Sequence, residues 1–402
     1  MNCRIALLSL LLLVAGLAGC ARPVARCPSP EDNPQHHYLM GMEALDKGKI
    51  DVAQEKFSRA IYCDDGFSKA HGGLAIVAAE NAREQADAGR RGVEAERSLE
   101  HLGNAEKQAR TDDDRFDCYM ASIRVHTILK GKGWLNKAED AFKDGSRLKV
   151  DERELVFYQG KEAISYFMGM AYLEALEFQK ARDRFSDVLN AKREGKWHER
   201  AEKGWKKVDR IVRAMSGITV GDVGKKIALK DAVTRADLAA LLIDEMKIDK
   251  LFAGRIPAVS QVEGLKAEFT PADTLGSQFR EEILTILKWK VRGMEPKYDE
   301  NTKAYLFFPA DLVKRGEMAF ILEDVLIRLT GDSKIATAYF GHKKSPFPDV
   351  RPTSPFYNAI MNMTTRGIME GELSGEFRVN APVEGAEALL AIRALKQRMN
   401  TY

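Results

Sequence analysis

The spacing of apolar residues along the chain predicts helices. A short apolar run extends from Ile5 to Val14, and later apolar residues recur with a helical period. The clearest amphipathic helices are expected in the C-terminal half, over Ala236–Met246, Glu317–Leu329 and Gly385–Arg398. The sequence therefore predicts a mainly α-helical protein.

The N-terminal half contains an internal repeat. The segment Tyr38-Leu-Met-Gly-Met42 recurs as Tyr166-Phe-Met-Gly-Met170, and in both copies three further positions follow the glycine after 12, 16 and 19 residues. Another copy with the same offsets begins at His126. Each unit is expected to form two helices joined by a short turn. The matched positions are Gly41, Ala53, Phe57 and Ala60 in the first copy and Gly169, Ala181, Phe185 and Val188 in the second.

One further unit is irregular. Ala75 and Ser98 are separated by 23 residues, where the corresponding positions of the other units are 12 apart. The additional 11 residues are close to three helical turns, so they can be absorbed without rotating the apolar face. The polar, alanine-rich segment Asn81–Gly92 suits a longer helix pair or a polar loop, and the sequence leaves both open.

This order of glycine, alanine and phenylalanine resembles the tetratricopeptide repeat. The resemblance implies four units over about residues 34–190, stacked into a curved solenoid whose concave face is lined by the first helix of each unit. Tyr38, Met42, Tyr166 and Met170 are therefore candidates for contacting a protein partner. Tyrosine and methionine at helical spacing suit a packed core equally well, and this alternative stays open.

A different repeat occupies the C-terminal half. Gly217, Gly293 and Gly367 head similar Gly-Ile or Gly-Met elements that are 76 and 74 residues apart. Each copy also carries a helix-start element near its end. In the last copy an aromatic-x-Asp-Val element and an aromatic followed by Ala-Ile precede the glycine. The helix-start elements of the first two copies are Thr234-Arg235-Ala236-Asp237 and Lys314-Arg315-Gly316-Glu317. The two aromatic elements of the last copy are Phe347-Pro-Asp349-Val350 and Phe356-Tyr-Asn-Ala359-Ile360.

The set resembles the S-layer homology domain, in three copies over about residues 197–396. The resemblance implies that the helix-start arginine holds an acidic group of the cell-wall glycan, because its fork of N–H donors suits a carboxylate. Arg235 is expected in a first helical turn with its guanidinium free and outside the core, and Asp237 is expected to close a capping box with Thr234. The implied glycan-binding residues are Trp205, Arg235, Asp237, Arg315, Glu317, Asp349 and Phe356.

Two departures from this family pattern limit the implied binding. The third copy has Glu384-Gly385 where Thr-Arg is expected, and the middle copy has an insertion over Tyr298–Leu306. At most two grooves between copies could then bind in the family manner. The alternative is that these residues only cap helices and the module is purely structural.

The N-terminus carries an export signal. Its apolar run is too short to span a bilayer, which takes about 20 apolar residues. The ending Leu17-Ala18-Gly19-Cys20 resembles the bacterial lipobox, which implies cleavage before Cys20 and a lipid on its thiol. Ala21 favours the outer membrane. The alternative is an ordinary secretory signal in which Cys20 is a bystander.

The remaining cysteines lie in a compartment that permits disulfides. Cys27, Cys63 and Cys118 are left after Cys20 is lipidated, so at most one intramolecular pair forms. The sequence leaves open whether any pair forms.

Composition and motifs exclude several function classes. The chain has 402 residues with 62 Lys+Arg and 59 Asp+Glu, and a net charge of +3 is too close to neutral to favour a nucleic-acid partner. There is no Gly-rich phosphate loop, zinc-protease motif, nucleophile elbow or Cys-x-x-Cys. We therefore expect no enzymatic activity, no catalytic residue, no cofactor and no metal.

Together these features predict a lipid-anchored cell-envelope protein, facing the periplasm from the outer membrane, that acts as a tether or scaffold. The solenoid would bind an unidentified envelope protein, and the C-terminal repeats would bind cell-wall polysaccharide or peptidoglycan. The alternative is an envelope assembly or secretion-accessory lipoprotein that binds only protein. The expected domains are a signal peptide at 1–19, a lipidated tether at 20–34, the solenoid at 35–192 and S-layer-homology-like repeats at 197–400.

Overall fold

The computed structural model describes residues 27, 29–191, 194–217, 219–254 and 269–399. The fold is mainly helical, as predicted, with 64% helix and 3% strand. The signal peptide expected at 1–19 and the lipidation expected at Cys20 lie outside the described residues. The chain divides into two compact units. The N-terminal unit comprises Met1–Ala175 and Asp187–Trp197, and the C-terminal unit comprises Leu176–Ser186 and His198–Tyr402.

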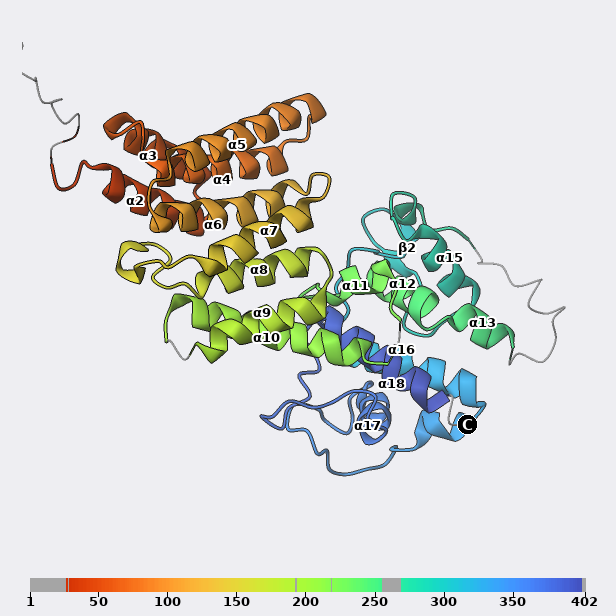
Figure 1. Cartoon of the computed structure of the whole chain (residues 1–402). Helices are drawn as coiled ribbons and strands as arrows, with labels where there is room; N and C mark the ends of the chain where they lie inside the picture. Colours follow the sequence, from red (N-terminus) through yellow and green to blue (C-terminus); the bar gives the residue numbers. More distant parts are fainter. Residues whose placement is uncertain (1–26, 28, 192–193, 218, 255–268, 400–402) are drawn as a thin grey trace, which may run out of the picture. The chain divides into compact units, whose positions relative to one another are not determined.

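The N-terminal unit is a succession of helix pairs (Figure 1). Consecutive helices pack against each other, and α4 also contacts α3 and α6, so that each pair lies against the next. The helix α8 (Ala163–Glu174) follows the 3-10 helix η1 (Glu152–Glu154). The pairs are α2 (Pro34–Asp46) with α3 (Ile50–Cys63), α4 (Ser68–Glu84) with α5 (Ala88–Gln108), and α6 (Asp112–Leu129) with α7 (Trp134–Arg147).

The repeated glycine, alanine and phenylalanine positions form the contacts between these helices. Ala53, Phe57 and Ala60 are fully buried. A Cβ atom added at Gly41 or at Gly73 would lie 2.5 Å from the Phe57 ring. Only glycine lets α2 and α4 approach this ring from both sides, which explains why the repeat keeps a glycine opposite its phenylalanine.

The irregular unit is a longer helix pair. Helices α4 and α5 have 17 and 21 residues, and residues 85–87 join them. The polar loop that the sequence left open as an alternative is therefore wrong. Ser98 stays in register, since its hydroxyl donates to the Ala75 carbonyl oxygen at 2.6 Å.

A disulfide joins Cys27 to Cys63, with the two Cα atoms 5.3 Å apart. It fastens the segment before α2 to the end of α3. Arg59 on α3 adds a second link between these two segments, since its Nε and Nη2 donate to the Asp32 carboxylate at 2.9 and 2.6 Å. Cys118 is a buried free thiol, and burial raises its pKa to about 12. The question that the sequence left open is settled in favour of one disulfide.

Helices α9 (Phe178–Asn190) and α10 (Lys196–Met215) contain residues of both units. The other elements that the structure describes in the C-terminal unit are helices and one two-stranded sheet. The helical segments are α11 (Asp222–Ala228), α12 (Arg235–Ala240), the π-helical η2 (Leu241–Glu245), α13 (Ile248–Ala253), η3 (Ala272–Thr274), α15 (Arg280–Lys288), α16 (Arg315–Thr330), η4 (Ser333–Thr337), α17 (Tyr357–Thr365) and α18 (Gly385–Met399).

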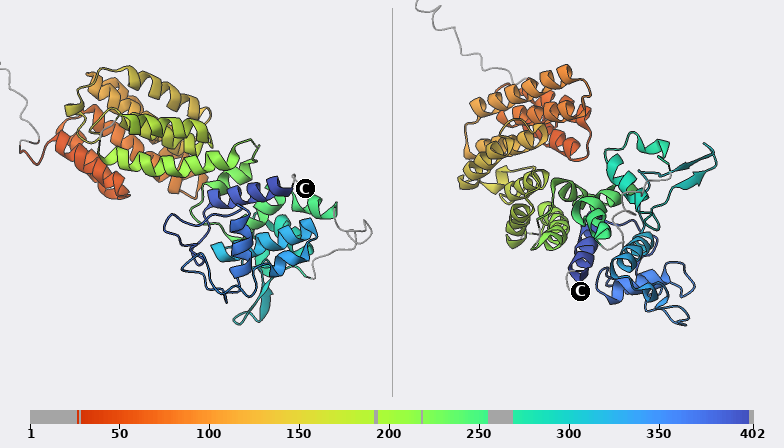
Figure 2. Two further views of the ribbon diagram at one scale, coloured as in Figure 1. Left: turned by 90° about the horizontal axis from the view of Figure 1, so that it is seen from below. Right: turned by 90° about the vertical axis from the view of Figure 1, so that its right-hand side faces the viewer.

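The sheet is an antiparallel hairpin of β1 (Lys297–Asp299) and β2 (Ala304–Leu306). It coincides with the insertion that the sequence shows in the middle copy. Figure 2 shows the hairpin projecting from the helices of the C-terminal unit in both views. Asp299 fixes its turn, since Oδ2 accepts from the Thr302 backbone N–H at 2.8 Å and from the Thr302 hydroxyl at 2.7 Å.

Three valines form a closed ring of backbone hydrogen bonds in the C-terminal unit. The Val313 N–H donates to the Val233 carbonyl oxygen at 2.9 Å, Val383 donates to Val313 at 2.9 Å, and Val233 donates to Val383 at 2.8 Å. All three side chains are buried. The ring therefore brings together three segments that are far apart in the sequence and places each valine two residues before a helix.

Candidate functional site

The three helices that follow the valine ring begin at equivalent points. They are α12, α16 and α18, and their first residues are Arg235, Arg315 and Gly385. The sequence motifs expected at the helix starts therefore converge around one centre. We call each of these helix starts, together with the segment of the neighbouring copy that packs on it, a junction. The contacts of each first residue determine whether its junction can bind a ligand.

Arg235 is buried, with 5% of its surface exposed. Its Nε donates to the Phe307 carbonyl oxygen at 2.9 Å, and Nη1 and Nη2 donate to the carbonyl oxygens of Gly293 and Glu295, each at 3.0 Å. The guanidinium also lies over the Phe307 ring, 4.7 Å from its centroid. The expectation of a free guanidinium outside the core is wrong, because the next copy folds its backbone around this side chain.

The acceptors of Arg235 are neutral carbonyl groups. Burial lowers the pKa of Arg235 below its ordinary value, and nearby carboxylates, Glu317 first among them, oppose this shift. An arginine side chain nevertheless keeps its charge in proteins. At the first junction the positively charged Arg235 guanidinium is therefore buried among backbone carbonyl oxygens.

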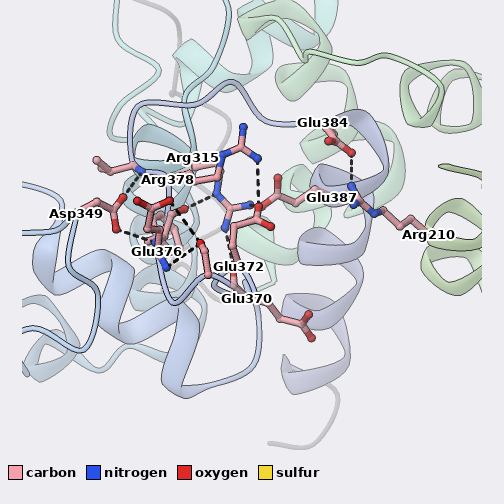
Figure 3. Close-up of polar contacts among 12 residues, drawn as sticks. Arg210, Arg315, Asp349, Glu370, Glu372, Glu376, Arg378, Glu384 and Glu387 are labelled. Carbon is pink, nitrogen blue, oxygen red and sulfur yellow. Dashed lines mark hydrogen bonds and ion pairs between the residues drawn. The ribbon is translucent and has the colours of Figure 1, made fainter. Parts of the chain in front are cut away.

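Arg315 occupies the equivalent position in the second junction but has carboxylate partners. It is 6% exposed, and its Nε donates to the Phe377 carbonyl oxygen at 2.8 Å. Its Nη1 forms an ion pair with Glu387 and lies 4.0 Å from Glu372 (Figure 3). Burial raises the pKa of Glu387 above its ordinary value, although Arg315 opposes the shift. The Arg315 guanidinium is therefore already paired with carboxylates of the chain itself, Glu387 and, at a longer distance, Glu372.

The third junction has no room for a side chain. A Cβ atom added at Gly385 would collide with the backbone carbonyl oxygen of Ile227 and lie 3.0 Å from the Ala228 Cα atom. The Gly385 N–H donates to the Lys230 carbonyl oxygen at 2.8 Å. The glycine at this helix start is thus required by close packing of two backbones.

The acidic residues of the helix-start motifs act as caps. Asp237 is 1% exposed, and its Oδ2 accepts the Thr234 backbone N–H at 3.0 Å, which confirms the predicted capping box. Lys230 Nζ forms an ion pair with Asp237 at 2.7 Å. Glu317 Oε2 accepts the Lys314 backbone N–H at 2.9 Å. These carboxylates stabilise helix N-termini.

Asp349 organises a loop. Its carboxylate accepts the backbone N–H groups of Phe377 at 2.8 Å and Val379 at 3.1 Å (Figure 3). Burial alone would raise the pKa of Asp349, but these N–H donors outweigh it and hold the pKa below its ordinary value. Asp273 does the same in the middle copy, where it accepts the N–H groups of Phe307 and Phe308 at 3.0 and 2.6 Å.

The two aromatic residues of the predicted glycan site are half-buried. Trp205 lies on α10, and its Nε1 donates to the Ser186 hydroxyl on α9 at 3.0 Å. Phe356 lies just before α17 and packs on the start of α16, where a Cβ atom added at Gly316 would be 3.0 Å from its ring. Both rings therefore help to pack helices together.

Comparison with protein families identifies one region. Residues 346–389 match the S-layer homology domain. No curated protein and no solved structure is significantly similar to the chain. Among the described residues, no helix is long and apolar enough to cross a membrane.

The S-layer homology match covers the last of the three predicted copies. Asp349 and Phe356 lie within it, as do Gly385 and Glu387. The resemblance noted in the sequence is thus confirmed for this segment. Trp205, Arg235, Asp237, Arg315 and Glu317 lie outside the matched residues. A glycan-binding role stays a prediction for all seven residues of the predicted site.

Half of the predicted partner-binding face is part of the core of the N-terminal unit. Tyr38 and Met42 are 3% and 1% exposed, and the Tyr38 hydroxyl donates to Asp117 Oδ1 at 2.5 Å. Of the two alternatives that the sequence left open, the packed core is the one that holds for these two residues, and the Tyr38 ring packs near that of Phe57 on α3. Tyr166 and Met170 are half-buried, so a surface role for them stays a prediction.

The described residues contain one group of side chains close enough to share a metal ion, namely Cys27, Asp32 and Cys63. Its two sulfur atoms are joined in the disulfide, so the group offers no thiolate pair to a metal.

Sequence reasoning missed two features of the junctions. Glu387 belongs to the motif of the third copy, but its pairing with Arg315 joins residues that are 72 positions apart. The hairpin places Tyr298 directly opposite Tyr305 in the sheet register. The turn-forming residues Asp299 to Thr302 between two short tyrosine-containing segments were an available signal for this hairpin.

Proposed function

We propose that this chain is a cell-envelope protein that binds a cell-wall polysaccharide or peptidoglycan through its C-terminal unit. The observation that carries the proposal is the S-layer homology match at residues 346–389. Domains of this family typically attach proteins to cell-wall polymers. A binding role rather than a catalytic one accords with a chain that carries no recognised catalytic motif.

The proposal extends the module to three copies. The hydrogen-bonded ring of Val233, Val313 and Val383 supports this extension, since each valine occupies the same place before a helix. Asp273 and Asp349 support it as well, because each binds two backbone N–H groups of the loop that leads to the next helix. The valine ring thus supports a module of three copies, and the two aspartates support the likeness of the middle copy to the matched one.

Two further parts of the proposal concern the N-terminal half. The paired helices, with Phe57 between Gly41 and Gly73, support a tetratricopeptide-like solenoid that binds an envelope protein. The lipobox-like ending at Cys20 supports the proposal of a lipid anchor in a membrane, and Ala21 favours the outer one.

The wall-binding proposal is tested by co-sedimentation of the purified chain, from residue 27 onward, with isolated cell walls. We expect saturable binding to intact walls. Walls stripped of their secondary polysaccharide show whether that polymer or the peptidoglycan is the ligand. A chain that stays in the supernatant with both preparations would contradict the proposal.

The lipid anchor makes a separate prediction. Cys20→Ser is expected to leave the protein unprocessed and without lipid, because cleavage follows modification of this thiol. Metabolic labelling with a fatty acid and membrane fractionation measure the effect. Cys3→Ser is the matched control, since this cysteine lies in the same segment but outside the lipobox. Mature size and membrane location that do not change in Cys20→Ser would refute the anchor.

A second candidate function is that of an assembly or secretion-accessory lipoprotein that binds only protein. It is favoured by the contacts of Arg235 and Arg315. Their N–H groups donate to the carbonyl oxygens of Phe307 and Phe377 and to other groups of the chain itself, rather than facing solvent where a glycan could bind them. The co-sedimentation experiment separates the two candidates.

A further inference from the structure

We propose that the β1–β2 hairpin and the cavity beside it form a subsite that stacks a sugar ring of the wall polymer. This inference rests on the proposed function for its class of ligand, and it locates the binding surface. The motif arginine Arg235 is assigned a different role, that of holding the hairpin in place.

The cavity lies against the base of the hairpin and has a volume of about 500 Å³, which is in the range of small-molecule sites. Its lining is mostly apolar, with Lys290 and Glu295 as its charged residues. The apolar lining residues are Phe269, Leu287, Val291, Met294, Pro296 and Tyr305.

Exposed aromatic rings gather at this cavity. Tyr298 and Tyr305 are 47% and 56% exposed, and Phe269 is 44% exposed. Tyr298 and Tyr305 are direct cross-strand partners, so both rings lie on the same face of the hairpin, with centroids 5.3 Å apart. The Phe269 ring lies 6.3 Å from that of Tyr305. A monomeric protein rarely leaves such a cluster in water unless the cluster binds something.

The chemistry of this surface suits a pyranose ring. One face of a sugar presents C–H groups, which pack on an aromatic ring, while its hydroxyl groups stay in water or reach polar side chains. Lys290 and Glu295 are the charged residues at the same cavity, and Glu295 Oε2 already accepts the Gly293 backbone N–H at 2.7 Å. Flat rings beside a few polar groups thus match the amphipathic character of a glycan.

The hairpin is held rigid before any ligand binds. Arg235 donates to the carbonyl oxygens of Gly293 and Glu295, just before β1, and to that of Phe307, just after β2. It therefore clamps both ends of the hairpin. Asp273 adds a second tie at Phe307, and Asp299 fixes the turn. A rigid platform loses little conformational entropy on binding.

The corresponding loop at the second junction is held by Arg315 and Asp349 in a similar way but lacks the aromatic rings. Between Gly371 and Glu376 it contains no aromatic residue. Its one large apolar side chain, Leu373, is fully exposed, and Glu372 from this loop lies near Arg315. The subsite is therefore assigned to the first junction, where the insertion in the middle copy supplies the rings.

The test compares substitutions of Tyr305 in co-sedimentation isotherms with intact and polysaccharide-stripped walls. Tyr305→Leu keeps an apolar side chain but removes the ring, and we expect its affinity to fall about tenfold for whichever wall the wild type binds. Tyr305→Phe keeps the ring and is expected to bind within about twofold of the wild type. Phe340→Ala is the matched control, since this ring is 68% exposed and does not line the cavity.

Thermal melts of the same variants separate binding from packing. Unchanged melting of Tyr305→Leu together with weaker binding supports the subsite. Wild-type binding that survives unaltered in Tyr305→Leu would overturn it and leave the proposed function intact. A loss of binding that parallels a loss of stability would assign the rings to packing and also overturn it. If the wild type binds neither wall, the proposed function fails and the subsite fails with it.

Discussion

Replacing Arg235 by alanine is expected to destabilise the C-terminal unit by about 3–5 kcal/mol. The substitution removes three charge-assisted hydrogen bonds and leaves the carbonyl oxygens of Phe307, Gly293 and Glu295 without this donor in a buried place. It also opens a void under the Phe307 ring. Because the C-terminal unit has roughly 200 residues, its melting temperature should fall by about 10 °C.

Circular dichroism and scanning calorimetry on the full chain measure this effect. Arg235→Lys should recover little stability, since one ammonium group cannot reach three carbonyls that a planar fork reaches together. Arg351→Ala is the matched control, because that arginine is exposed in the same unit. A melt of Arg235→Ala that matches the control would show that the buried contacts contribute nothing.

Gly385→Ala is expected to destabilise the same unit by at least about 3 kcal/mol. The new Cβ atom would collide with the Ile227 carbonyl oxygen, which is backbone and cannot rotate away as a side chain can. Gly385→Arg, which restores the arginine of the family motif, should be worse and should prevent the valine ring from closing. Restoring the consensus residue is thus predicted to harm this protein.

Chemical denaturation curves of the two variants measure the loss. Gly276→Ala serves as the control, since nothing lies within 4 Å of the position that its Cβ would occupy. If Gly385→Ala is as stable as the control, α18 can shift away from Ile227, and the close approach between them is not required for folding.

The helical repeats of the N-terminal half could be recognised from the sequence because their determinants are local. Gly41, Ala53 and Phe57 lie within one pair of helices, so their spacing reports directly on how the helices meet. Tyr38 was harder to place. Its buried hydroxyl is paired with Asp117, which lies 79 positions away, and a contact over that separation cannot be predicted from a local sequence pattern.

The roles of the two motif arginines could not be read from the sequence for a similar reason. The backbone acceptors of Arg235 lie 58 to 72 positions further on, and any residue can supply a carbonyl oxygen. The carboxylate of Glu387 was visible, but its position beside Arg315 depends on closure of the ring. A side chain that looks solvent-facing within its own helix is thus enclosed by the next copy.

The ring of Val233, Val313 and Val383 also determines when the C-terminal unit can finish folding. Its last member, Val383, belongs to the third copy, so the first copy must wait during synthesis for the third to emerge. An open array of repeats can gain or lose a unit at either end, whereas a closed ring fixes the number of its members. A nascent chain that stops short of Val383 would leave the Val233 N–H and the Val313 carbonyl oxygen without their partners, and a neighbouring chain can then bind to these groups.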